Sequence, residues 1–79
     1  MTKKMIYTYA YKIDETHTPQ GLIDIAQKYR MHCNIETRKY PRWFFVQFTG
    51  KKLDDIADLF DKEADDAGYE VGMFIEEYL

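Results

Sequence analysis

Cysteine, glycine and proline are scarce in this sequence of 79 residues, and each shortage excludes a class of protein. The one cysteine, Cys33, has no partner for a disulfide within the chain. That excludes a secreted disulfide-rich scaffold and favours a reducing compartment, the cytoplasm. Four glycines and two prolines leave no room for a flexible linker, so we expect a single domain over residues 1–79.

Long apolar runs are missing as well. The longest, at residues 43–46, is far too short to cross a membrane, and the first residues lack the cleavage site of a signal peptide. The chain is nevertheless 46% hydrophobic and 16% aromatic, which is too much apolar material for a disordered segment. We therefore expect a soluble, folded domain that does not enter a membrane.

Charge of one sign dominates each end of the chain, although the net charge is only -3. Residues 1–52 carry ten lysines and arginines against four acids, whereas residues 53–79 carry Lys62 against ten acids. Such segregation marks either an interaction surface or two solvated faces that attract each other within one fold.

The spacing of apolar residues predicts four strands and two helices. Alternation with a period of two is typical of strands, and apolar residues at i, i+3, i+4 and i+7 are typical of amphipathic helices. Thr18 before Pro19 indicates a helix start, and Gly68 is well placed to end the second helix in the left-handed conformation. In chain order, we expect a strand at 5–13, a helix at 18–29, strands at 33–38 and 42–49, a helix at 53–67 and a strand at 69–78.

This order, β-α-β-β-α-β, predicts an α+β protein with the ferredoxin-like arrangement: a four-stranded antiparallel sheet with two helices on one face. The first and third strands are then central, and the opposite face of the sheet is open. The residues expected to face the sheet from the helices are Leu22, Ile25, Ala26, Leu53, Ile56, Ala57 and Phe60.

Aromatic residues are the main candidates for the open face. On the third strand Gln47 shares a face with Trp43 and Phe45, and this polar residue indicates that the face points outward. On the fourth strand we expect Val71, Met73 and Ile75 to be buried. The orientation of the first strand is ambiguous. Lys4 and Lys12 share a face with Thr8 and Ala10, and lysines by themselves indicate that this face is exposed and that the tyrosines point inward. Small residues suit close packing of helices on a sheet, and we therefore expect the tyrosines to face outward. The expected partner-binding aromatic face consists of Tyr7, Tyr9, Tyr11, Trp43, Phe45 and Phe74, with Tyr78 beside it.

The stretch at residues 45–48 is similar to the end of the longer RNA-contact motif of RRM domains, which share this fold. Tyr7 stands where that family places the aromatic of its shorter motif. The sequence departs from the pattern at Pro41 and Arg42, where the family has a basic residue and glycine. The resemblance implies a single-strand nucleic-acid binder that stacks bases on Tyr7, Trp43 and Phe45 and contacts phosphates through Arg38, Lys39 and Arg42. A net charge of -3 makes nucleic acid the less favoured partner.

Catalytic and metal-binding patterns are incomplete. Residues 61–65 match the first half of a calcium loop, but Asp66 replaces its turn glycine and Gly72 its bidentate glutamate. His32 and Cys33 are neighbours on a predicted strand and so point to opposite faces. We therefore expect no catalytic residues, no metal and no cofactor, and hence not an enzyme.

The second helix presents a continuous acidic side. Asp54, Asp58, Asp61 and Asp65 recur at i, i+4, i+7 and i+11, and Asp55 and Asp66 flank them. Like charges at these spacings cost a few tenths of a kcal/mol per pair. Such repulsion is tolerated either for solubility or to present a negative surface to a basic partner, and both alternatives stay open.

Together these features favour a small non-enzymatic protein-binding module. We expect it to act on a basic surface of another protein through its acidic helix, its aromatic sheet face, or both. Compact acidic domains of this sort are often encoded by phages as inhibitors of host proteins, an analogy of fold and charge. The alternatives are the nucleic-acid binder above and a homodimer that pairs its open sheet faces.

Overall fold

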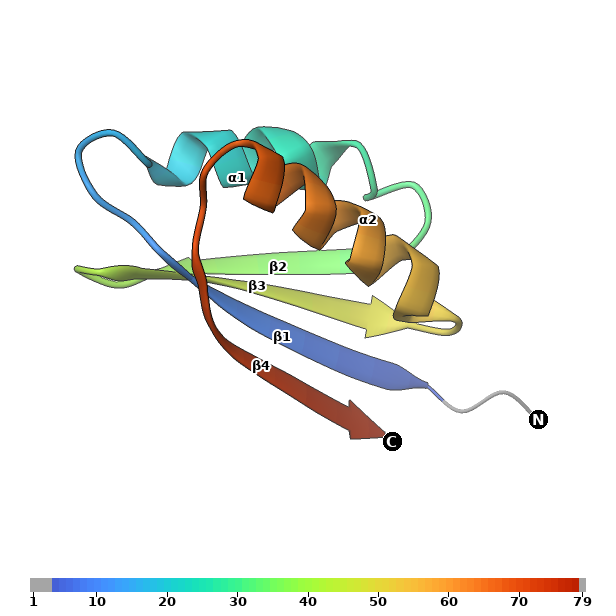
Figure 1. Ribbon diagram of the computed structural model, residues 1–79. Coiled ribbons are helices and arrows are strands. Elements are labelled where there is room, and N and C mark those ends of the chain that lie inside the picture. The colour runs from blue at the N-terminus through green and yellow to red at the C-terminus, as the bar shows by residue number, and fades with distance from the viewer. Residues whose placement is uncertain (1–3, 79) are drawn as a thin grey trace.

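The computed structural model describes residues 4–78 and contains six elements (Figure 1). Their order confirms the predicted β-α-β-β-α-β arrangement, and every boundary lies within two residues of the expected one. The elements are β1 (Met5–Lys12), α1 (Pro19–Gln27), β2 (Asn34–Lys39), β3 (Trp43–Gly50), α2 (Leu53–Asp66) and β4 (Val71–Tyr78).

The four strands form one antiparallel sheet in the order β2-β3-β1-β4. Strand β1 is central and pairs with β3 on one side and β4 on the other. Both helices lie on one face of the sheet, α1 over β2 and α2 over β3 and β1 (Figure 1). This is the ferredoxin-like arrangement, with β2 and β4 as the edge strands.

Local sequence explains where α2 ends. Gly68 has φ +90°, a left-handed conformation that glycine adopts without steric cost. The Gly68 amide donates to the Asp65 carbonyl at 2.9 Å, and the Tyr69 amide donates to the Ala64 carbonyl at 2.9 Å. These two bonds make the Schellman motif that satisfies the last carbonyls of a helix. They also turn the chain back toward the sheet, where β4 begins.

The core lies between the helix layer and the sheet. Leu22, Ala26, Leu53, Ala57 and Phe60 are buried, and Ile25 and Ile56 pack partly buried against them, which confirms the predicted helix faces. The sheet contributes the following buried side chains: Tyr7, Tyr9, Tyr11, Ile35, Phe44, Val46 and Phe48.

The expectation that the tyrosines of β1 face outward is wrong. Tyr7, Tyr9 and Tyr11 all point toward the helix layer, and Tyr11 is 0% exposed. The physical reason is the polar tip of each ring. The Tyr7 hydroxyl donates to Asp54 and the Tyr11 hydroxyl donates to Asp61, so the rings are buried while two of the hydroxyls find acceptors on α2.

The assignment of β4 is also wrong. Val71, Met73 and Ile75 are exposed rather than buried, and Phe74 lies in register with Tyr9, on the helix side of the sheet. An irregularity in the pairing between Ala10 and Tyr11 shifts the register near Gly72. Because α1 and α2 lie over the other three strands, neither helix covers β4.

Candidate protein-binding surface around β4

Strand β4 is exposed along its whole length, an unusual state for an apolar strand. Five of its side chains are large and apolar, and their exposed fractions lie between 39% and 56%. Its outer edge pairs with no other strand of the described chain. Native proteins normally cover or charge such an edge, because its unpaired backbone groups and apolar side chains attract other chains. These five residues are Val71, Met73, Phe74, Ile75 and Tyr78.

The open side of the sheet carries an apolar strip that crosses three strands. The pairing places Phe45 opposite Ala10, and Ala10 opposite Met73, with Ile75 two residues farther along β4. Trp43 lies at the end of this strip and is 37% exposed. The predicted outward orientation of Trp43 and Phe45 is therefore confirmed, whereas Phe74 lies on the other side of the sheet.

Gly72 allows the Trp43 ring to lie directly on β4. A Cβ at Gly72 would come within 2.3 Å of the Trp43 ring, so this position has no space for a side chain. The two residues, with Ala10, Phe45 and Met73, line a shallow apolar hollow of about 220 Å³. The strip thus has a concave part that fits an apolar side chain of a partner.

A second hollow on the open side is polar. It has a volume of about 250 Å³ and lies on the β2 side of Phe45. Gln47 donates to the Thr8 hydroxyl at 3.3 Å within it. Its lining residues are Thr8, Glu36, Thr37, Arg38, Tyr40, Phe45 and Gln47. The open face therefore changes from apolar at β4 to polar and charged at β2.

The helix side of β4 continues the aromatic core beyond the helices. The centroid of the Phe74 ring lies 4.7 Å from that of Tyr9 and 5.4 Å from that of Tyr7, and the rings of Phe74 and Tyr7 meet edge to face. Phe74 is nevertheless 46% exposed, because α2 does not extend over it. The Tyr78 hydroxyl donates to Glu76 at 2.7 Å on the same side.

The tyrosines of β1 face the acidic side of α2. The Tyr11 hydroxyl lies 2.8 Å from Asp61, and the Tyr7 hydroxyl donates to Asp54. Burial, helped by the charges of Asp61, Asp58 and Glu76, raises the pKa of Tyr9 to about 12. Burial and the bond to Asp61 also raise the pKa of Tyr11. Part of the predicted acidic surface thus has a structural role as acceptor for buried hydroxyls.

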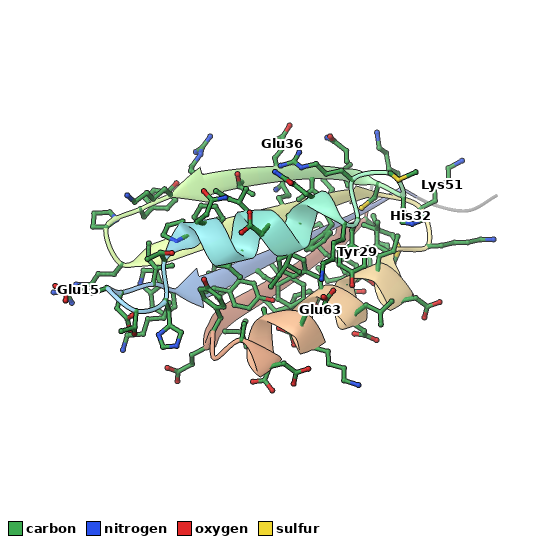
Figure 2. The ribbon with its side chains drawn as sticks, turned by 90° about the horizontal axis from the view of Figure 1, so that it is seen from above. Glu15, Tyr29, His32, Glu36, Lys51 and Glu63 are labelled. Carbon is green, nitrogen blue, oxygen red and sulfur yellow. The ribbon has the colours of Figure 1, made fainter. Side chains whose placement is uncertain are left out.

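The other acidic residues of α2 point toward α1, toward solvent, or to the side that Asp54 and Asp61 occupy. Glu63 faces α1, where it accepts hydrogen bonds from Tyr29 and, at 2.6 Å, from Lys28; Tyr29 and Glu63 point toward each other in Figure 2. Helical spacing of about 100° per residue places Asp55 and Asp66 on the solvent side, and both are exposed. Asp58 and Asp65 share the side of Asp54 and Asp61.

The residues of the nucleic-acid alternative are not gathered in one place. Tyr7 is buried on the helix side and is not available for stacking. Arg38 lies on the open side opposite Phe45, whereas Lys39 pairs with Phe44, whose side chain is in the core. Arg42 lies in the turn before β3, and its carbonyl accepts the amide of Ile13 at 3.0 Å.

Polar groups elsewhere have structural roles. The Asp14 carboxylate accepts the amide of His17 at 2.7 Å and the hydroxyl and amide of Thr16, both at 2.9 Å, and these bonds lower the pKa of Asp14 to about 2. The His17 ring packs edge to face against Tyr69 and lies close to Gly68. Within residues 4–78, no three side chains of His, Cys, Asp or Glu come together as a metal site. No helix in that range is long and apolar enough to cross a membrane.

The sequence pattern places Val71, Met73 and Ile75 in the core and so misses the exposure of all three. Tyr78 is exposed as expected, but it lies on the helix side of the sheet instead of beside the open face. A signal was available: residues 71–78 carry large apolar side chains on both faces of the strand, without the polar alternation of a half-covered strand. The same pattern describes a fully buried strand, and only the position of the helices distinguishes the two.

Comparisons with known proteins identify no family. No family model matches the chain, and no curated protein matches it. One solved structure similar to it is a domain of unknown function, DUF77, from Bacillus cereus, with a TM-score of 0.49 and 13% sequence identity; the alignment covers 100% of this chain and 77% of that one.

Proposed function

We propose that this protein is a non-enzymatic binding module that packs another protein against β4 and the adjoining sheet surface. The observation that carries the proposal is the exposure of all eight residues of β4, including five large apolar side chains. Leaving such a strand in water forgoes about 25 cal/mol for each Å² of apolar surface that a partner would cover. The mode of action that fits a small acidic domain is inhibition, by occupying a basic surface of the target.

The test compares matched variants in affinity capture from the organism that encodes the protein. Tagged wild type, Ile75→Lys and Leu59→Lys are used as baits, and retained proteins are quantified by mass spectrometry. Leu59 is 53% exposed but lies on α2, away from β4, so its variant controls for a new surface lysine. We expect a protein retained by wild type and Leu59→Lys and lost with Ile75→Lys. Equal retention by all three baits, or none by wild type, would refute the proposal.

A second candidate is a homodimer that pairs open sheet faces. The observation in its favour is the continuous apolar strip of Trp43, Phe45, Met73 and Ile75. A two-fold pairing covers this strip without a foreign protein. Light scattering at micromolar concentrations should then give twice the monomer mass for wild type and a lower mass for Trp43→Ala. A strict monomer at high concentration would end this candidate.

A further inference from the structure

The helix side of β4 and the neighbouring flank of α2 form one surface, here called the α2–β4 surface. Its apolar part is Val71, Phe74 and Tyr78, and all three are exposed. Its acidic part is Glu76 on β4 and a row on α2 that consists of Asp54, Asp58, Asp61 and Asp65. In Figure 1 β4 lies outside the helix layer, with α2 as the nearer of the two helices.

The contacts of the tyrosines place the acidic row on the side of α2 that faces β4. Tyr7 donates to Asp54 and Tyr11 donates to Asp61, and both tyrosines belong to β1, the strand next to β4. Phe74 touches the same row of rings, since it lies 4.7 Å from Tyr9. The carboxylates accept from Tyr7 and Tyr11, and Phe74 packs on Tyr7 and Tyr9, so both kinds of side chain border one row of tyrosine rings.

The acidic row has no cationic partner among residues 4–78. The ion pairs in that part of the chain join His17 to Asp14 and Lys28 to Glu63, and neither includes a residue of the acidic row. Asp58 accepts no hydrogen bond from another described side chain, and Asp54 and Asp61 accept only neutral hydroxyls. A partner that covers Phe74 would be attracted by this row if it were basic and repelled if it were acidic.

A second copy of the chain does not fit this surface. A two-fold contact through the α2–β4 surface brings the acidic rows of two α2 helices together, whereas a pairing of open sheet faces leaves these rows on the far side of each sheet. Like charges placed side by side across an interface oppose association. Charge complementarity thus selects a different, basic partner.

The geometry of the sheet favours a helix as the occupant. Strands lie about 4.8 Å apart, so β4 is about 7 Å from the line between β1 and β3 over which α2 packs. Packed helices lie about 8–10 Å apart, so a helix next to α2 would be centred over β4 and its free edge. A strand added to that edge would instead lie in the plane of the sheet and leave Phe74 uncovered.

We propose that the α2–β4 surface binds a basic amphipathic helix of a partner protein, which completes the helix layer over β4. The apolar side of that helix covers Phe74, Val71 and Tyr78, and lysines or arginines along one flank face Asp54, Asp58 and Asp61. This inference rests on the proposed function and names the chemistry of the partner. Since α2 has 14 residues, a helix of about the same length spans the row.

Three synthetic peptides of 18 residues test the proposal. The first has leucines along one helical stripe and lysines and arginines on its flanks. The second keeps the leucines and replaces the basic residues by glutamates, and the third has the composition of the first in an order without a stripe. Binding to the full chain is measured by fluorescence anisotropy and mapped by amide chemical shifts. We expect only the first peptide to bind, about tenfold more weakly at 0.3 M salt than at 0.05 M, with shifts on α2 and β4.

Matched variants locate the contact. Phe74→Ala should weaken binding of the first peptide about tenfold, whereas Leu59→Ala, also exposed but on the solvent side of α2, should not. Replacing Asp58 and Asp65 by asparagine should weaken it about fivefold and flatten its salt dependence. The control replaces Asp55 and Asp66, which removes the same charge from the solvent side, and should change binding about twofold or less.

Equal binding of all three peptides, no binding of the first, or shifts confined to the open face around Phe45 would each overturn the inference. The affinity capture above separates this failure from that of the proposed function. If capture of a protein still depends on Ile75 while the basic peptide fails to bind, only the chemistry assigned to the α2–β4 surface is wrong. If both fail, the binding module itself is refuted.

Discussion

Strands β1 and β4 lie side by side and have similar apolar content, yet β1 is largely buried and β4 is exposed. The three tyrosines of β1 are buried beneath the helix layer, whereas every residue of β4 is exposed. The difference is one of cover, since the helices pack over β2, β3 and β1 and stop short of β4. Apolar composition marks a strand as able to be buried, and the position of the nearest helix decides whether it is.

The comparison also separates two uses of aromatic residues. On β1 the hydroxyls of Tyr7 and Tyr11 tie the sheet to α2, so these rings stabilise the fold. On β4 the side chains of Phe74 and Tyr78 are about half exposed, beside carboxylates that have no cationic partner among residues 4–78. We interpret the first group as structural and the second as the binding surface.

The largest expected difference in the free energy of unfolding is between alanine variants of two phenylalanines. Phe60 is 0% exposed and packs on Phe48 and Tyr11, so Phe60→Ala should lower the free energy of unfolding by about 3–5 kcal/mol. Phe74→Ala removes a half-exposed ring and should cost about 1 kcal/mol or less. Urea unfolding of both variants measures the difference. Equal losses would mean that β4 is covered after all.

Alkaline pH tests the buried tyrosines of β1. Tyrosine in the unfolded chain has a pKa near 10, whereas the folded chain holds that of Tyr9 at about 12 and raises those of Tyr7 and Tyr11. Above pH 10 the unfolded state therefore binds fewer protons than the folded state, and stability falls as pH rises. Each such tyrosine contributes up to about 1.4 kcal/mol per pH unit.

Thermal unfolding between pH 9 and pH 12 measures this loss. Tyr11→Phe should flatten the fall in melting temperature, and Tyr40→Phe, on an exposed ring, serves as the control. A melting temperature independent of pH up to 12 would contradict the burial of the β1 hydroxyls.

A smaller effect is expected where β4 meets the open face. Gly72→Ala places a methyl group within 2.3 Å of the Trp43 ring, which must move away. Such overpacking costs about 1–3 kcal/mol, less where the ring can swing toward solvent. Trp43 is the one tryptophan of the chain, so its fluorescence spectrum reports the displacement. An unchanged spectrum would show that Trp43 does not lie on β4.

The smallest contrast lies within the acidic row. Asp58→Asn should raise stability by a few tenths of a kcal/mol, because it relieves repulsion from Asp54 and Asp61 and breaks no side-chain hydrogen bond within residues 4–78. Asp54→Ala should instead lower stability by about 1 kcal/mol, because the buried Tyr7 hydroxyl loses its acceptor. Thermal denaturation at low salt compares the two. Equal signs would remove the distinction between structural and free acids.

Much of the fold could be predicted because its signals are local. The periodicities over Leu22–Ala26 and Leu53–Phe60, and the role of Gly68, depend on residues within one element. Trp43 and Phe45 could be assigned to the open face because Gln47 shares their side of β3. The tyrosines could not, since a ring with a hydroxyl suits a buried site with an acceptor as well as an exposed one.

The sequence by itself determined the order of the elements, the sides of the helices that face the sheet and the segregation of charge along the chain. These follow from backbone preferences and from the period of apolar residues within each segment. Only the tertiary structure decided that the tyrosines turn inward and that β4 stays uncovered. Both outcomes depend on where α2 lies across the sheet, because its position brings Asp54 and Asp61 over β1 and leaves Phe74 outside. That position is set by packing between residues distant in sequence, and no local pattern encodes it.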